Sequence, residues 1–435
     1  MSLGGGIFTA QNKILPGTYI NFYSTPRATA VMSDRGVAAM PFELDWGVEG
    51  EIFEVSNSDF YKNSQKIFGY SYNHIKMRNL RELFLHAKSV LCYRMGIGIK
   101  ASNNIATAKY AGTRGNDITI IVTKDVDNAD LYVVETALDG SIKDSQTVGT
   151  LAELTSNDYV DFKITGSLTV TAGTPLTEGG NGTVTGEDYQ GFLDKLESYT
   201  FNILGYAGQD EKIKSLWAVF TKRMRDELGV KFQTVLHDYN KADEYGIISV
   251  ENDCTNSDAN ISDLVYWTAG AEAGCAVQDS LANTAYDGEL SVDTNYTQSQ
   301  LAQALESGKL VFHSMNGIVK VLDDINTFVS TSDEFGDEFK SNQTIRVIDV
   351  IGTSIANVFN NKYYGKFNND DHSRIALKND IIKILESLAG VGAIDNFTSD
   401  NVIVSEGDVK KAVFVELKIT VAGVMTHLYI MANVA

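Results

Sequence analysis

The sequence of 435 residues is poor in proline and cysteine. Its 4 prolines stand at positions 16, 26, 41 and 175, so no proline-rich linker separates its parts. The 3 cysteines, Cys92, Cys254 and Cys275, form an odd set without the spacing of a zinc site. We therefore expect reduced, structural cysteines and neither a disulfide framework nor a metal centre.

Long apolar runs and positive charge are also scarce. No stretch approaches the ~20 apolar residues of a membrane helix, and the first residues lack the basic and apolar regions of a secretory signal. We expect no membrane insertion and no secretory signal. The chain has 36 Lys and Arg against 56 Asp and Glu, a net charge of −20. Nucleic-acid binding is not expected, because it needs a basic footprint.

Catalytic signatures are missing as well. Gly96-Ile97-Gly98-Ile99-Lys100 does not have the spacing of a phosphate loop, and neither Gly-x-Ser-x-Gly nor His-Glu-x-x-His occurs. The nearest approach to a ligand cluster is Asp370-Asp371-His372, which we interpret as a helix cap. The sequence therefore predicts no catalytic residues, no cofactor and no metal.

Charge is distributed unevenly along the chain. Residues 1–20 carry only Lys13, and residues 341–435 carry nine basic and ten acidic side chains. The deficit therefore lies in residues 21–340. A neutral part can pack closely against copies of itself, whereas an acidic part stays in water. This pattern favours self-association through the two ends.

The middle of the chain contains two kinds of secondary-structure pattern. Residues 101–184 predict closely spaced strands of a small barrel or sandwich, with a flexible exit at Glu178–Gly182. On both sides, apolar periodicity predicts helices that alternate with strands, as in an α/β domain. The expected strands of the insertion are Ile118–Val122, Leu131–Leu138, Tyr159–Ile164 and Leu168–Thr171. The expected helices include Arg78–Cys92, Glu187–Tyr199, Glu211–Leu228, one capped by Thr297 with Gln300 in capping-box position, Gln343–Phe359 and Asp371–Leu388. Asn316-Gly317 predicts the turn of a β-hairpin.

Both ends of the chain have residue patterns typical of β-strands. Ile7–Phe22 is apolar and extended, positions 413 to 421 alternate with period two, and Met425–Met431 offers a further strand after a turn at Ala422-Gly423. Apolar strands at chain ends invite pairing with another chain. We expect the inter-subunit strands to include Ile7, Phe8, Tyr19, Ile20, Phe22, Val413, Val415, Leu417, Ile419, Val421, Leu428 and Ile430.

Several stretches, taken in order, carry a resemblance to a known family. The stretches that carry it are Phe8–Lys13, Leu15–Phe22, Ala108–Ile118, Tyr266–Gly274, Arg346–Asp349 and Tyr363–Lys366. With these stretches, from about residue 5 to the C-terminus, the chain resembles the contractile-tail sheath proteins of myophages and phage-like defective prophages. The resemblance does not separate infectious phages from defective prophages or bacteriocin-like particles.

The resemblance implies a multidomain α+β fold with four parts. These are an N-terminal assembly strand at 1–20, a middle α/β domain at 21–100 and 186–340, an outer β-rich insertion at 101–185, and a C-terminal sheath-core domain at 341–435. It also implies a helical homopolymer around an inner tail tube, attached to baseplate and tail-terminator proteins. Such a virion tail is assembled in the bacterial cytoplasm, and contraction drives the tube through a cell envelope without nucleotide.

A positive strip stands out in the C-terminal part. Five basic residues lie near Asp370, Asp371 and Asp380, and two of them, four residues apart, share a helix face. Because the family's C-terminal domain faces the inner tube, the strip is a candidate tube-facing surface. An ordinary solvated helix face and a contact between rings of subunits are the alternatives. The five residues are Lys362, Lys366, Arg374, Lys378 and Lys383.

Two other functions stay open from the sequence. The β-rich insertion could serve a receptor-binding or cell-wall-binding virion module. A soluble α/β enzyme with an accessory β-domain is the weaker alternative, because no motif supports it.

Overall fold

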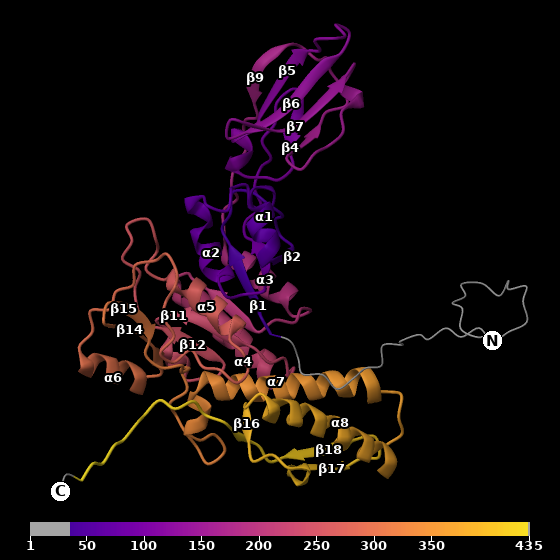
Figure 1. Ribbon diagram of the computed structural model, residues 1–435. Helices are drawn as coiled ribbons and strands as arrows, with labels where there is room; N and C mark the ends of the chain where they lie inside the picture. Colours follow the sequence, from indigo (N-terminus) through magenta and orange to yellow (C-terminus); the bar gives the residue numbers. More distant parts are fainter. Residues whose placement is uncertain (1–34, 434–435) are drawn as a thin grey trace, which may run out of the picture.

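The computed structural model describes residues 35–433, which form three bodies stacked along one direction (Figure 1). A β-rich insertion lies at one end, an α/β middle domain at the centre, and a helical and β-stranded C-terminal domain at the other end. The expected multidomain α+β class is confirmed. The expected N-terminal strand, with Ile7, Phe8, Tyr19, Ile20 and Phe22, lies outside the described residues.

The middle domain is built on a seven-stranded sheet with the order β13-β12-β11-β10-β1-β3-β2. All neighbours are parallel except β2, which pairs antiparallel with β3. Strands from before and after the insertion therefore share one sheet. The strands are β1 (Val37–Phe42), β2 (Ile52–Ser56), β3 (Ser89–Arg94), β10 (Ile203–Tyr206), β11 (Gln233–His237), β12 (Ile247–Val250) and β13 (Lys309–Leu310).

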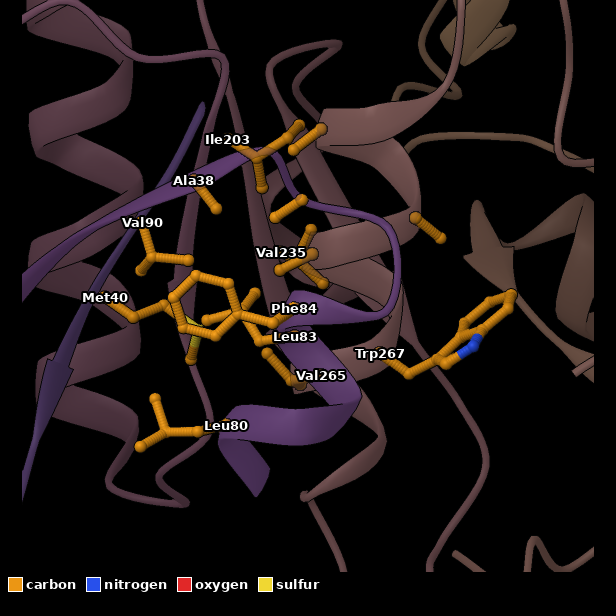
Figure 2. Close-up of a cluster of buried hydrophobic side chains, with 14 of the residues drawn as sticks. Ala38, Met40, Leu80, Leu83, Phe84, Val90, Ile203, Val235, Val265 and Trp267 are labelled. Carbon is orange, nitrogen blue, oxygen red and sulfur yellow. The ribbon is translucent and has the colours of Figure 1, made fainter. Parts of the chain in front are cut away.

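Helices cover both faces of this sheet. Ala38 and Met40 of β1 join one cluster of buried side chains, while Ala39 between them joins the other. In the first cluster the strands meet Leu83, Phe84 and other helical side chains (Figure 2). A strand buried on both faces is apolar throughout. The first face is covered by α1 (Asn57–Phe68), α2 (Arg78–Phe84) and α5 (Leu264–Gly274), the second by α3 (Gly186–Leu196) and α4 (Glu211–Asp226).

The single helix expected over Arg78–Cys92 is wrong beyond Phe84. The chain leaves α2 there and forms β3, whose Val90 and Leu91 enter opposite clusters. A short apolar run can be a buried strand or a helix, and periodicity alone does not separate the two. Elsewhere in the domain local signals succeed. Thr297 caps α6 (Gln298–Glu306), and Asn316-Gly317 turns the hairpin of β14 (Phe312–Met315) and β15 (Ile318–Val321).

The insertion contains a four-stranded sheet, β7-β6-β5-β9, and a two-stranded sheet, β4-β8. Ile118, Ile120 and Val134 are buried in its own core. The sequence does not signal β7, because its exposed residues show no apolar alternation. The strands are β4 (Ala106–Ala108), β5 (Thr119–Lys124), β6 (Tyr132–Leu138), β7 (Ser141–Val148), β8 (Val160–Phe162) and β9 (Thr171–Pro175).

The glycine-rich exit at Glu178–Gly182 is packed, which corrects the expectation of a flexible segment. Gly180 exchanges backbone hydrogen bonds with Ile99 at 2.8 and 3.1 Å, and Thr177 does so with Ser102. A Cβ on Gly182 would lie 2.3 Å from the Ile97 carbonyl oxygen. The glycines therefore allow the entering and leaving strands of the insertion to touch.

The C-terminal domain packs two long helices against short strands. Its core includes Val347, Ile351, Ile381 and Leu385. Asp370 caps the second helix by accepting a hydrogen bond from the Ser373 amide, as expected. The elements are α7 (Asn342–Val358), a π-helical turn (Phe359–Tyr363), α8 (Asp371–Gly390), β16 (Ile394–Asp395), β17 (Val402–Glu406), β18 (Val413–Leu417) and β19 (Thr420–Val421).

Candidate assembly site

An antiparallel hairpin of β17 and β18 lies on α8 with both strand edges open. Val402 pairs with Leu417 and Glu406 with Val413, and no third strand joins the pair among residues 35–433. An isolated two-stranded hairpin is marginally stable, and open edges are templates for further pairing. The hairpin can therefore accept strands from outside the chain.

The period-two pattern correctly identifies which side chains of β18 face inward. Val413, Val415, Leu417, Ile419 and Val421 are half-buried against the core of their own C-terminal domain. Phe414, on the opposite face of β18, is 57% exposed. These five side chains stabilise their own domain, so any contact between subunits at β18 would use its backbone edge.

Beyond β19 the chain runs away from the body as an extended tail (Figure 1). The strand expected over Met425–Met431 is not formed in this single chain. Leu428 is 83% exposed and Ile430 79% exposed. We call residues 424–433 the tail. Its apolar side chains lack cover in the chain described.

A hollow of about 630 Å³ lies where the start of β18 meets the π-helical turn and α8. Phe359, Tyr363 and Phe367 supply aromatic walls, and Arg374 and Lys411 supply positive charge. The hollow is next to Val413 and so adjoins the open hairpin.

Three residues of the expected basic strip pair with two carboxylates, so the strip is only partly neutralised. Lys362 lies 2.5 Å from the carboxylate of Asp380, and Lys383 lies 3.6 Å from the same group. Arg374 pairs with Asp371 and donates to the Asn369 side chain at 2.7 Å. Lys366 donates to the Asn361 carbonyl. Lys378 makes no ion pair within the part of the chain that the structure covers.

The inner joint, between the middle and C-terminal domains, is made of buried charges. Arg346 on α7 lies 2.6 Å from Glu272 on α5 and 3.4 Å from Asp324, and all three side chains are 0% or 1% exposed. Asp349, one turn further along α7, accepts two hydrogen bonds of 2.7 Å from Arg225 on α4. Paired hydrogen bonds of this kind fix orientation as well as distance.

The two carboxyl groups beside Arg346 differ in their ionisation. Burial, together with the adjacent Asp324 carboxylate, raises the pKa of Glu272 to about 8. Burial also acts to raise the pKa of Asp324, but Arg346 and hydrogen bonds outweigh it and hold that pKa below its usual range. At neutral pH Arg346 therefore faces one charged carboxylate and one group that is mostly protonated.

The buried contacts of the outer joint, between the middle domain and the insertion, are made to backbone groups, whereas the Lys66–Asp158 ion pair across it is half exposed. Arg94, 1% exposed, donates to the carbonyl oxygens of Leu44, Gly47 and Ala111 at 2.8 to 2.9 Å. Arg114 donates to the Gly69 carbonyl at 2.8 Å and pairs with carboxylates that are half exposed. Its guanidinium also lies 4.3 Å from the Tyr70 ring centroid.

The sequence does not reveal the partners in these joints. Nothing local indicates that Glu272, Asp324 and Arg225 meet α7, because they lie 22 to 124 positions away. A signal did exist in the stretches that carry the family resemblance. They contain Arg114, Glu272, Arg346 and Asp349, which are all joint residues.

Other kinds of site find little support in the described part of the chain. No group of three or more His, Cys, Asp or Glu side chains among residues 35–433 is placed to hold a metal ion. No helix in that range is long and apolar enough to span a bilayer.

Comparisons with known families cover nearly the whole of this architecture. The Gp18 tail sheath domain III N-terminal region matches residues 35–95, and the phage tail sheath β-sandwich domain matches residues 96–181. The phage tail sheath central domain matches residues 182–327, and the phage tail sheath C-terminal domain matches residues 334–435.

Individual relatives agree with these matches. The phage-like element PBSX protein XkdK of Bacillus subtilis is 32% identical over 81% of each chain. A sheath tail protein from Desulfitobacterium hafniense is 34% identical, with a TM-score of 0.83 over 93% of this chain and 97% of that one. The contracted helical sheath of the anti-feeding prophage shares the fold, with a TM-score of 0.56 at 13% identity over 97% of this chain and 99% of that one. The chain therefore belongs to the phage tail sheath family and is a tail sheath subunit.

Proposed function

We propose that the subunit polymerises by exchanging strands between C-terminal domains, which link copies into a contractile sheath around an inner tube. The open β17–β18 hairpin is the acceptor, and the tail of another copy is one donor. The expected N-terminal strand is the second donor. Because donor and acceptor differ, the contact is heterologous and propagates as an open helix.

The observation that carries this proposal is the pairing of an unfilled sheet with an uncovered apolar strand in one chain. Val424, Met425, Leu428, Tyr429, Ile430 and Met431 are all exposed. Burying each large side chain is worth about 1.5–3 kcal/mol. The two open edges of the β17–β18 hairpin can form main-chain hydrogen bonds with an added strand. Each link between copies would therefore combine apolar burial with backbone pairing.

Strand links would act as tethers during contraction. They allow the folded bodies to rotate and slide while the copies remain connected. The driving free energy would come from the difference in buried surface between an extended and a contracted packing. No nucleotide is needed for such a change, and the proposed role is structural and not enzymatic.

The remaining partners follow from the same role. Lys362, Lys366, Arg374, Lys378 and Lys383 are the candidates for contact with an acidic inner tube, and Lys366 and Lys378 have no carboxylate partner among residues 35–433. Baseplate and tail-terminator proteins would bind the ends of the polymer, and assembly would take place in the bacterial cytoplasm.

Electron microscopy of purified protein tests the proposal. The double variant Leu428→Asp with Ile430→Asp changes only exposed tail residues, so the monomer should unfold at the wild-type temperature but form no tubes. The control is Ile142→Asp, at an apolar position of the insertion that is 56% exposed. It should form tubes like wild type. Tubes of equal length and number from the tail variant would refute strand exchange through the tail.

A further inference from the structure

The first turn of α7 touches the start of the tail. Gln343, 3% exposed, donates through Nε2 to the carbonyl oxygens of Gln278 at 2.7 Å and Ala422 at 3.0 Å. Its Oε1 accepts from the Val424 amide at 3.1 Å. One side-chain amide thus binds the backbone on both sides of Gly423, much as a neighbouring strand would.

The same turn is fixed to the middle domain by its adjacent polar residues. Asn342 donates to Asp324 at 2.8 Å and to the Ile325 carbonyl at 3.0 Å, and it accepts from Gln233 on β11 at 2.9 Å. Arg346, one turn later, contacts Glu272 and donates to the Asp279 carbonyl at 2.6 Å.

The chain also enters the middle domain beside this cluster. Arg35 donates from Nη2 to the Glu272 carbonyl oxygen at 3.0 Å, two residues before β1 begins. The entry to the fold, the inner joint and the start of the tail therefore meet around the first turn of α7.

We propose that Asn342, Gln343 and Arg346 are positioning residues that fix where the tail leaves the subunit and tie this exit to the middle domain. We call these three residues the tail anchor. The inference rests on the proposed exchange of tails between copies, and it adds that a pull on the tail passes into the middle domain.

The geometry gives a reason why anchoring matters. Beyond Val424 the tail is highly exposed, so the free tether begins immediately after the Gln343 contact. If that contact were lost, the two-residue strand β19, paired with β16, and the hydrogen bond from the Ala422 amide to the Ala393 carbonyl would have to hold the tail. The direction of the tether would then no longer be set by α7.

Amide hydrogen exchange on the full-length monomer tests the anchor. Gln343→Ala should speed exchange at Val424 about tenfold, the equivalent of losing one or two net hydrogen bonds. The more demanding variant is Glu272→Ala, which removes the hydrogen-bonding carboxyl group, because Glu272 does not touch the tail. It should still speed exchange at Val424 about threefold, by loosening Arg346 and Asn342.

Two matched controls separate anchoring from general destabilisation. Glu82→Ala makes the same change at a carboxyl that is also 0% exposed but accepts a hydrogen bond from Tyr286, away from α7. Asn357→Ala changes an exposed position of α7 itself. Neither variant should selectively speed amide hydrogen exchange at Val424. If Glu272→Ala speeds amide exchange at Val424 no more than Glu82→Ala does, the coupling is refuted. If Gln343→Ala leaves Val424 unchanged, the whole anchor is refuted.

The monomer measurement is independent of polymerisation. Absence of tubes from wild-type protein would count against the proposed function and leave the exchange result standing. Wild-type tubes together with unchanged exchange in the variants would overturn the tail anchor alone.

Discussion

The inner joint connects the middle domain to the C-terminal domain, and the outer joint connects the middle domain to the insertion. The two joints are held together by different kinds of interaction. In the inner joint, arginine side chains meet buried carboxyl groups across the domain boundary, as at Arg346–Asp324 and Arg225–Asp349. In the outer joint, the Arg94 side chain donates to three backbone carbonyl oxygens, and glycines allow close backbone approach.

This difference predicts different sensitivities. A buried ion pair depends on charge, because removing one partner leaves the other uncompensated in a medium of low polarity. A joint of backbone contacts depends on shape, because a single added methyl group can force the strands apart. The inner joint should therefore respond most to changes of charge, and the outer joint to changes at glycine.

The largest effect is expected from Arg346→Met. It leaves the Asp324 carboxylate buried without its partner, which should cost about 3–5 kcal/mol of unfolding free energy. Denaturant unfolding followed by tryptophan fluorescence measures it. The control Lys383→Met removes a half-exposed cation 3.6 Å from Asp380 and should cost at most about 0.5 kcal/mol. A loss below about 1 kcal/mol for Arg346→Met would contradict the charge dependence of the inner joint.

The next effect concerns Gly112→Ala in the outer joint. Gly112 has φ of +121°, and an added Cβ would lie 2.1 Å from the Asp45 carbonyl oxygen. We expect a loss of about 2–3 kcal/mol and faster proteolytic release of the insertion. Gly140→Ala is the matched control, since it also has positive φ but open space around it, and it should cost only about 1 kcal/mol. Equal losses for the two variants would argue against shape as the decisive factor.

A smaller effect should appear as pH dependence of the inner joint. With a folded pKa of about 8 against an ordinary value of 4.5, Glu272 binds a proton in the folded chain that the unfolded chain has released. Stability should therefore fall as pH rises from 6.5 to 7.5, by at most about 1.4 kcal/mol. The ionisation of Asp324 changes stability with pH in the opposite direction. Because its pKa is lowered in the folded chain, this change is confined to pH below ~4.

Comparison with Glu272→Gln isolates this contribution. The amide does not titrate, so the variant should lose less stability than wild type between these two pH values. Denaturant midpoints measured at both values check it. Parallel changes in the two proteins would show that Glu272 does not carry the dependence.

The smallest effect is expected for Lys362→Ala, which tests a partly exposed pair within the C-terminal domain. The side chain of Lys362 is 35% exposed and that of Asp380 is 6% exposed. Because solvent screens such a pair, the loss should be about 1 kcal/mol or less by thermal unfolding. A loss as large as that of Arg346→Met would remove the distinction between buried and exposed pairs.

Elements with a strong local signal could be predicted from the sequence. The apolar stripe of α4, the capping box at Thr297 and the Asn316-Gly317 turn each depend on neighbouring residues alone. The inward face of β18 followed from strict alternation. By contrast, β3 was mistaken for helix because a buried strand is apolar at every position, and β7 lacked any apolar pattern.

The candidate site was predictable only in outline. The alternation of apolar residues indicated strands at the C-terminal end. It did not indicate that β18 pairs with β17 of the same chain. The joint residues are charged, and charged residues usually lie at the surface, so residue type alone does not predict that they are buried. Only contacts between distant segments explain Arg346 and Glu272, and a single sequence does not contain that information.

Cryo-electron microscopy of the assembled polymer tests the central claim most directly. The account predicts that residues 424–433 of one copy form a strand on the β17–β18 hairpin of another, so that each hairpin gains at least one strand. A map in which every hairpin keeps two strands, with the tail folded onto its own chain, would contradict it.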